Sequence, residues 1–239
     1  MEKIITFENI RNFAYCNDRI CKVPIRGMVV DFFGLGGMSM YAEETRDGTF
    51  FAEKGILLLV PYNNPWAWMN AQAVAYTDEL IGVVKAHFGL GKIPLVSVGG
   101  SMGGLSALVY TRYSAHGVSA CVANCPVCDL PYHFTERPDL PRTLYSAFWN
   151  EEGTLQNAME KRSPLHLAQE MPRVPYVLFH CDADKAVNID MHSRKFVAAM
   201  REAGQNISFT VVPDRDHCDL TEEAKEAYFD TIARFAMGE

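Results

Sequence analysis

The sequence lacks the features that mark membrane and nucleic-acid-binding proteins. No apolar run approaches the ~20 residues that a membrane-spanning helix requires. The residues after Met1 lack the long apolar core of a secretory signal, so we expect a cytoplasmic protein without a membrane partner. Basic residues are few, 22 Lys and Arg against 29 Asp and Glu, and they form no cluster. The resulting net charge of −7 argues against a nucleic-acid partner.

Cysteine does not occur in the pattern of a disulfide framework. The seven cysteines are an odd number and are scattered, which favours reduced thiols. Cys125 and Cys128 have the C-x-x-C spacing of zinc and redox sites, but no second such pair and no H-x-x-x-H pair completes a ligand set. We interpret them as small buried residues. The sequence therefore implies no metal and no organic cofactor.

What is present suits one α/β domain. The length of 239 residues is sufficient for one domain with a large core and short for two domains. The hydrophobic fraction of 49% and the charged fraction of 21% are ordinary for a globular protein. No internal repeat and no low-complexity linker divides the chain. Predicted strands alternate with predicted helices, which indicates a mostly parallel central sheet covered on both faces. We therefore predict a single domain over residues 1–239, with the fold of a three-layer α/β sandwich.

The predicted elements follow from apolar runs and helical periodicity. Strands are expected at residues 26–33, 55–60, 93–98, 118–123, 175–180 and 207–212. Helices are expected at residues 71–88, 194–203 and 222–236. Near the start, residues 4–15 and 19–23 are predicted to form an antiparallel hairpin with Asn17 and Asp18 at its turn.

The segment 127–173 interrupts this alternation. It contains five prolines and several aromatic residues, which indicate short helices between two strands. An insertion at this point would lie over the carboxyl edge of the sheet, where open α/β folds bind their ligands. We predict a small helical cap, although a long connection that only packs for stability fits the same pattern.

The stretch 95–108 combines a strand, a tight turn and the start of a helix. Gly99, Ser101 and Gly103 form a Gly-x-Ser-x-Gly motif at the turn. Glycine removes the Cβ atoms that would clash there, so the Ser101 hydroxyl is held at the carboxyl end of the strand. A phosphate-binding loop is excluded because no lysine follows Gly104.

Two later strands end in loops that supply the rest of a serine-hydrolase site. The strand 175–180 runs into an acidic loop with Asp184, and the strand 207–212 runs into a loop with His217. A serine hydroxyl needs a base to take its proton, and the base needs a carboxylate to orient it. Since parallel strands end at one edge of their sheet, we predict Ser101 as nucleophile, His217 as base and Asp184 as acid.

Four short motifs together match a known family. They are Gly-Gly-Ser-Met-Gly-Gly at 99–104, Ser-Pro-Leu at 163–165, His180-x-x-x-Asp184-x-x-Val187 and Pro213-x-x-x-His217. From about residue 26 to the C-terminus the chain resembles the α/β-hydrolase family, and in detail its prolyl-oligopeptidase and acetyl-esterase branch. The resemblance implies the α/β-hydrolase fold. It also implies that Asp184, four residues after the strand-ending His180, is the acid.

Other assignments for the acid and the base remain open. Four further aspartates lie near strand ends or beside the histidine: Asp129, Asp182, Asp214 and Asp216. We favour Asp184 on its spacing and on the family resemblance. His180 is expected to be a hydrogen-bonded residue at a strand end rather than the base.

The oxyanion hole needs two backbone N–H donors. The first is predicted at Met102, the residue after the nucleophile. The family resemblance places the second at Leu35, after the strand 26–33. The sequence departs from the family at Phe33, Cys181 and Asp216, where the family often has His, Gly and Gly. These departures remove no predicted triad residue, but they leave the substrate class open.

The substrate is the least defined part of the prediction. Candidate substrate contacts are Phe33, Trp66, Trp68 and Trp149, although packing against the insertion fits the tryptophans equally well. The chain is expected to be too short for the propeller of a full oligopeptidase, so we predict a carboxylesterase acting on small or medium esters. The alternatives are a serine peptidase of the prolyl-oligopeptidase type and a non-catalytic ligand-binding protein. The expected partner is a small ester or short peptide, and homo-oligomer formation is left open.

Overall fold

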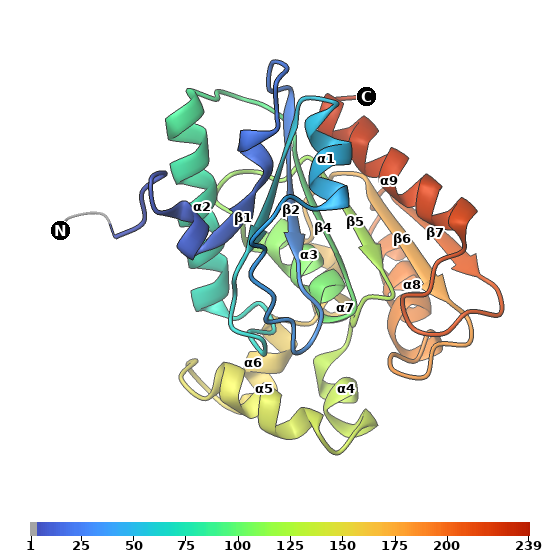
Figure 1. Cartoon of the computed structure of the whole chain (residues 1–239). Coiled ribbons are helices and arrows are strands. Elements are labelled where there is room, and N and C mark those ends of the chain that lie inside the picture. Colours follow the sequence, from blue (N-terminus) through green and yellow to red (C-terminus); the bar gives the residue numbers. More distant parts are fainter. Residues whose placement is uncertain (1–3) are drawn as a thin grey trace.

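The computed structural model describes residues 4–239, which build a seven-stranded sheet between layers of helices (Figure 1). The strands are β1 (Ala14–Cys16), β2 (Gly27–Phe32), β3 (Ile56–Pro61), β4 (Leu95–Gly100), β5 (Ala120–Asn124), β6 (Tyr176–Cys181) and β7 (Ile207–Val212). Their order in the sheet is β1-β3-β2-β4-β5-β6-β7. Every neighbouring pair is parallel except β1 with β3. The predicted mostly parallel α/β fold is confirmed.

Helices cover both faces of this sheet and extend beyond one end of it. The α-helices are α1 (Arg46–Ala52), α2 (Ala71–Phe88), α3 (Met102–Tyr113), α4 (Leu130–Glu136), α5 (Leu140–Phe148), α6 (Leu155–Lys161), α7 (Pro164–Leu167), α8 (Lys195–Glu202) and α9 (Glu222–Met237). Shorter turns are η1 (Ile10–Asn12), η2 (Asn17–Arg19), η3 (Ala168–Glu170) and the π-helical η4 (Asp190–Arg194). Among the helices that the structure describes, no one combines the length and apolar character that a membrane crossing demands.

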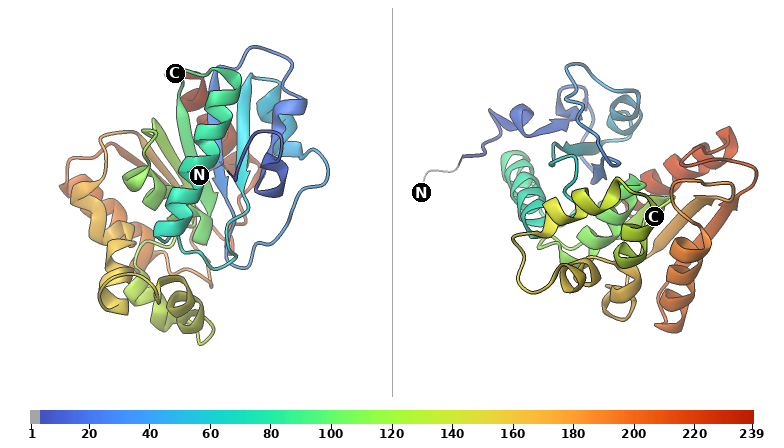
Figure 2. Two further views of the ribbon diagram at one scale, coloured as in Figure 1. Left: turned by 90° about the vertical axis from the view of Figure 1, so that its left-hand side faces the viewer. Right: turned by 90° about the horizontal axis from the view of Figure 1, so that it is seen from below.

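The core consists of two apolar layers, one on each face of the sheet. Val30 and Phe32 of β2 belong to the layer with α2, α3 and α8, whereas Val29 belongs to the layer with α1 and α9. Figures 1 and 2 show α2 and α9 on opposite sides of the sheet. The central strands are therefore buried on both faces, and β3 is buried along its whole length. Such double burial explains why these strands are continuous apolar runs in the sequence.

The longest helix matches its prediction residue for residue. α2 begins after Asn70, whose side chain accepts a hydrogen bond from Ala73 N–H, and ends at Gly89 with φ of 63°. These are a side-chain N-cap and a left-handed C-cap. The expected inward residues, including Leu80, Ile81 and Val84, are all buried.

The predicted N-terminal hairpin is wrong in its partner strand. β1 pairs antiparallel with β3, and residues 19–23 form no strand. The buried Asn17 side chain donates to the carbonyl oxygens of Gly48 and Ile56 and accepts from Leu58 N–H. These hydrogen bonds attach the chain after β1 to the neighbouring strand and turn it into η2. An antiparallel pair does open the chain, but its second strand lies about forty residues further on.

The helices α4, α5, α6 and α7 all lie between β5 and β6 in the sequence. In Figures 1 and 2, α4, α5 and α6 gather beyond one end of the sheet, and the contacts among these three helices hold them together. Since α4 follows the carboxyl end of β5, this group lies toward the carboxyl edge. Its action as a cap over a substrate stays a prediction.

Candidate active site

The turn between β4 and α3 forces Ser101 into an unusual backbone conformation. Ser101 has φ of 60° and ψ of −125°, and its N–H donates to the carbonyl oxygen of Asn124 at 2.9 Å. A residue other than glycine in this region carries strain of about 1–3 kcal/mol, which is typical of functional sites. The predicted nucleophile therefore occupies a strained turn directly before a helix N-terminus.

Close backbone approach explains the glycines around this serine. A Cβ added at Gly99 would lie 2.5 Å from Gly103 carbonyl atoms, and one at Gly103 would lie 2.0 Å from the carbonyl oxygen of Phe32. Neither position has room for a side chain, so the turn can be this tight only with glycine at both. The Gly-x-Ser-x-Gly motif is thus a packing requirement of the turn.

The loops after β6 and β7 bring Asp184 and His217 together. Asp184 Oδ2 lies 2.7 Å from His217 Nδ1, and Asp184 Oδ1 accepts hydrogen bonds from the N–H groups of Ala186 and Val187. Burial of Asp184 disfavours its charge. Hydrogen bonds from His180, His217 and Val187 nevertheless hold the pKa of this carboxyl well below its usual range. Asp184 is therefore an ionised carboxylate that fixes the ring of His217.

One ring nitrogen of His217 is available for proton transfer. Burial alone would lower its pKa, but Asp184 and then Cys125 outweigh that effect and raise the pKa of His217 to about 9. Because Nδ1 is held by the carboxylate, the other nitrogen, Nε2, is the one that can exchange a proton with a substrate or a serine. The side chain is 24% exposed and lines the same cavity as Ser101.

His180 is a structural residue, as its position at a strand end suggests. Its side chain is fully buried, with Nδ1 2.7 Å from Ser193 Oγ and Nε2 3.1 Å from the carbonyl oxygen of Val187. Nε2 also lies 3.3 Å from Asp184 Oδ2. Both nitrogens are engaged, so His180 supports the carboxylate and has no atom left to act as a base.

The structure gives the competing aspartates other partners. Asp182 accepts from the N–H of Asp214, and Asp129 caps α4 by accepting from Tyr132 N–H. Asp216 accepts from Lys185 N–H and forms an exposed ion pair with the same lysine. Of the five aspartates considered from the sequence, Asp184 is the one whose carboxylate contacts the His217 ring.

Ser101 and His217 line one cavity of about 580 Å³ at the carboxyl edge of the sheet. Phe33 and Leu35 line it as well, whereas Met102 begins α3 beside it. Within residues 4–239, neither the Leu35 N–H nor the Met102 N–H donates a hydrogen bond to a protein acceptor. Both donors named as the oxyanion hole are therefore available at this end of the sheet.

Several cavity residues were not predicted from the sequence. Asp31, Asp47, Asn124 and Arg137 line the same cavity, and the buried Asn124 Oδ1 has no partner among the described residues. Burial, and then the charge of Asp47, raise the pKa of Asp31 to about 7. A charged residue within an apolar strand was the available signal for Asp31. The other residues reach the cavity only through the tertiary fold.

The tryptophans do not line this cavity. Trp68 is fully buried, its Nε1–H donates to Thr143 Oγ1 at 3.1 Å, and its ring contacts that of His133. Trp68 thus belongs to the core and packs against the insertion, which is the second of the two alternatives predicted for it. Trp66 and Trp149 line a separate hollow of about 560 Å³ beside α2. Of the four predicted aromatic contacts, Phe33 alone lies with Ser101.

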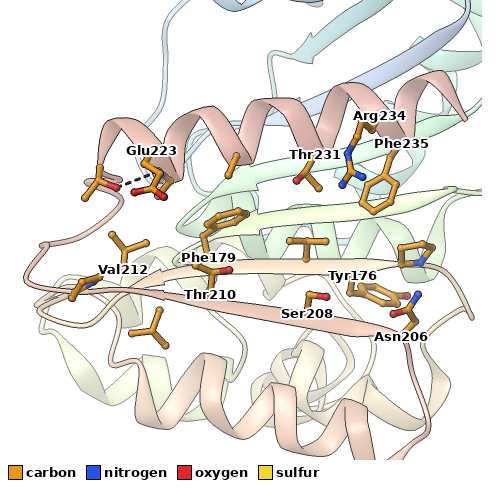
Figure 3. Close-up of a pocket in the computed structure, with 17 residues that line it drawn as sticks. Tyr176, Phe179, Asn206, Ser208, Thr210, Val212, Glu223, Thr231, Arg234 and Phe235 are labelled. Carbon is orange, nitrogen blue, oxygen red and sulfur yellow. Dashed lines mark hydrogen bonds between the residues drawn. The ribbon is translucent and has the colours of Figure 1, made fainter. Parts of the chain in front are cut away.

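A larger hollow of about 630 Å³ lies elsewhere, between α9 and the strands β6 and β7 (Figure 3). Figure 3 shows Phe179 and Thr210 on its sheet side, with Thr231, Arg234 and Phe235 projecting from α9. It contains none of the predicted catalytic residues. We therefore locate the candidate chemistry at the smaller cavity, where a strained serine and an oriented imidazole are both present.

A second cluster of titratable groups joins α4 to η4. His133 Nδ1 and His192 Nε2 both contact Glu136 Oε2, and the three side chains have the composition of a metal site. His192 Nδ1, however, accepts hydrogen bonds from the N–H groups of Cys128 and Asp129. Its proton must then sit on Nε2 and point to Glu136, which disfavours metal ligation by that nitrogen. The cluster is an anchor between two segments.

Comparison with known proteins supports the same chemistry. The model of the prolyl oligopeptidase family matches residues 84–238, which is well over half of the chain and includes the serine, the aspartate and the histidine. A comparison with curated protein sequences gave no significant match.

Solved structures with this fold include both peptidases and esterases. A puromycin-hydrolyzing peptidase of Mycobacterium tuberculosis superposes with a TM-score of 0.69 at 17% identity, covering 91% of this chain and 35% of that chain. Esterase 2 of Thermogutta terrifontis, phosphonylated by sarin, gives a TM-score of 0.64 at 21% identity, covering 87% and 82%. The acylaminoacyl peptidase of Pyrococcus horikoshii gives 0.66 at 13% identity, covering 88% and 36%. The chain thus spans about a third of the length of these peptidases and most of the length of the esterase.

Proposed function

Because the chain belongs to the prolyl oligopeptidase family of serine hydrolases, we propose that it cleaves carboxylic esters of small or medium acyl groups through an acyl-enzyme intermediate. One observation carries the proposal: an imidazole fixed by a buried carboxylate at 2.7 Å lines the same cavity as a serine with φ of 60°. This combination places a base, the acid that orients it and a nucleophile in a strained turn at one edge of the sheet.

In the proposed mechanism Ser101 attacks the ester carbonyl while His217 Nε2 takes the hydroxyl proton. Asp184 keeps the ring in the tautomer with the proton on Nδ1 and stabilises the imidazolium that forms. The Met102 and Leu35 N–H groups bind the oxyanion, and each such donor is worth about 3 kcal/mol of transition-state stabilisation. His217 then protonates the leaving alkoxide, and a water activated by the same imidazole releases the acid.

The cavity favours a small uncharged acyl group. Phe33, Leu35 and Ala186 give its wall apolar surface beside Ser101, which suits an alkyl chain. This lining supports an esterase. The peptidase alternative is supported by the two peptidases, whose structures superpose on this chain with TM-scores of 0.69 and 0.66.

Rates on two substrate series test the proposal. p-Nitrophenyl esters with acyl chains of increasing length are compared with aminoacyl arylamides, including proline derivatives. We expect the highest kcat/KM on short esters and negligible cleavage of arylamides. A kcat/KM on proline arylamides equal to or above that on esters would establish the peptidase instead. An absence of turnover on both series would favour a ligand-binding protein.

A further inference from the structure

Two cysteine thiols lie beside the ring nitrogen of His217 that the proposed mechanism uses. Cys218 Sγ is 3.8 Å from His217 Nε2. Cys125 Sγ completes a group in which the two sulfur atoms and a ring nitrogen all lie within 4.8 Å of one another. Both cysteines are free thiols, and they lie 93 positions apart in the sequence. The proposed mechanism gives neither of them a task.

One of the three spacings is close to that of a zinc site, and the other two lie within 4.8 Å. With Zn–S bonds of about 2.3 Å and Zn–N bonds of about 2.0–2.1 Å, tetrahedral angles place sulfur and nitrogen about 3.6 Å apart and two sulfurs about 3.8 Å apart. The 3.8 Å between Cys218 Sγ and His217 Nε2 is within a few tenths of an ångström of the first value. Small side-chain movements would therefore bring all three donors onto one ion.

The surroundings of the donors also match those of metal ligands. Asp184 holds His217 by Nδ1 at 2.7 Å, which is the carboxylate–histidine arrangement found behind zinc-bound imidazoles. Cys125 Sγ accepts hydrogen bonds from the N–H groups of Cys181 and Cys218, both at 3.4 Å. The carboxylate and the two N–H donors thus fix the positions of His217 Nε2 and Cys125 Sγ from outside the ligand set.

The site is open on one side. His217 and Cys218 line the cavity that contains Ser101, so an ion can arrive from solvent and a water can fill a fourth position. Cys125 and Cys218 have φ of 44° and 57°, in the region that favours glycine. The backbone therefore holds both thiols beside the imidazole in spite of local strain.

We propose that Cys125, Cys218 and His217 Nε2 bind one zinc ion, and that the bound ion switches off the hydrolase by occupying the nitrogen that must accept the serine proton. Binding releases to solvent the two thiol protons and, where the imidazole is protonated, the proton on His217 Nε2; no electron is transferred. The inhibitory part rests on the proposed function, whereas the ligand set does not. Zinc here is a reversible inhibitor and takes no part in ester cleavage.

The test measures metal binding separately from activity. Full-length protein is freed of metal by a chelator and kept reduced, then titrated with zinc chloride against a chromophoric chelator, and separately with cadmium chloride. We expect one zinc per chain and an ultraviolet band from cadmium–thiolate charge transfer. In Cys125→Ser and Cys218→Ser the Kd for zinc should rise at least about tenfold, since losing a supporting second-shell partner alone costs 10–100-fold. Cys21→Ser, which removes a thiol outside the site, is the matched control.

Inhibition is then measured by p-nitrophenyl ester hydrolysis, and the rate of each variant with zinc is compared with its own rate without zinc. Zinc should inhibit the wild type, EDTA should restore its rate, and the two site variants should resist inhibition. Equal zinc affinity in wild type and Cys218→Ser would overturn the proposal. So would a Cys125–Cys218 disulfide that accounts for inhibition while zinc has no effect on the reduced protein. Ser101→Ala should keep the cadmium band. In the wild type, a cadmium band without any ester turnover would support the metal site while refuting the proposed esterase.

Discussion

Asp184 is the residue on which the proposed proton transfer depends most. Its carboxylate contacts His217 and His180 and accepts two backbone N–H groups, and its side chain is fully buried. These donors make it a permanent anion at neutral pH and fix the ring of His217 with Nε2 toward the cavity. An uncharged residue of the same shape would keep the packing and lose this control over the tautomer.

Asp184→Asn is therefore expected to lower kcat by about 10⁴-fold, since an amide can hold the histidine in the wrong tautomer. Hydrolysis of a p-nitrophenyl ester provides the measurement. Asp182→Asn, two residues away and bonded to Asp214 N–H, is the control and should change kcat by no more than a few fold. Equal losses in the two variants would remove Asp184 from the role of orienting acid.

The raised pKa of His217 makes a prediction about the pH profile. The base must be neutral to accept a proton, and its pKa is raised from 6.5 to about 9, so kcat/KM should rise with pH and reach half its maximum near pH 9. In Asp184→Asn the midpoint should move to lower pH. The same shift stabilises the fold below pH 6.5, and this contribution is lost as the pH rises through about 9. A midpoint near pH 6 in the wild type would show that the carboxylate does not control the imidazole.

At the scale of elements, one carboxylate connects α4 to the turn that follows the Asp184 loop. Glu136 at the end of α4 contacts His133 on its own helix and His192 on η4, and it accepts from Asn188 N–H. Burial opposes the charge of Glu136, but the two histidines lower its pKa to about 2. The helices beyond the end of the sheet are thus held to the segment that also carries the acid.

Removal of this charge should loosen that connection. Glu136→Gln leaves the volume unchanged and replaces an acceptor of several hydrogen bonds by a group with one acceptor and one donor end. We expect the free energy of unfolding to fall by about 1–3 kcal/mol in urea titration, as for other buried hydrogen bonds to a charged group. Glu152→Gln, at an exposed position, is the control and should leave the midpoint unchanged. An unchanged midpoint in Glu136→Gln would mean that the cluster adds no stability.

Local pattern was sufficient for some elements and insufficient for others. The bounds of α2 and β7 could be predicted because helical periodicity and a strand-length apolar run are properties of neighbouring residues. The pairing of the first strand could not be predicted in this way, because the hydrogen-bond partners of Asn17 lie more than thirty residues further along the chain. The serine, aspartate and histidine could be named because each follows a strand. The proximity of Cys125 and Cys218 could not be predicted from the sequence. The two residues follow different strands, β5 and β7, and only the folded chain brings them into contact.

At the scale of the whole molecule, negative charge extends to the cavity. The chain carries a net charge of −7, and Asp31 and Asp47 line the cavity with Ser101. Arg137 also lines it, but this guanidinium is paired with Asp139 at 2.6 Å. Above pH 7, where Asp31 loses its proton, the cavity is acidic.

Esters that carry a carboxylate should therefore be poor substrates. At pH 8 we expect a lower kcat/KM for a p-nitrophenyl ester with an anionic acyl chain than for a neutral ester of equal length, and the gap should narrow as salt screens the charges. At low salt, Asp47→Asn should reduce the difference in kcat/KM between the neutral and the anionic ester. Asp190→Asn, on the exposed η4, should leave this difference unchanged. A preference for the anionic ester would contradict an acidic cavity.

The central claim is that Ser101 is a nucleophile activated at the edge of the sheet. Labelling of the native protein with a fluorophosphonate probe, followed by mass spectrometry of the modified peptide, tests it most directly. The account predicts one label on Ser101 in the wild type, no label in Ser101→Ala, and no label in the wild type after unfolding. Absence of label in the native wild type, or equal labelling of Ser101→Ala, would contradict it.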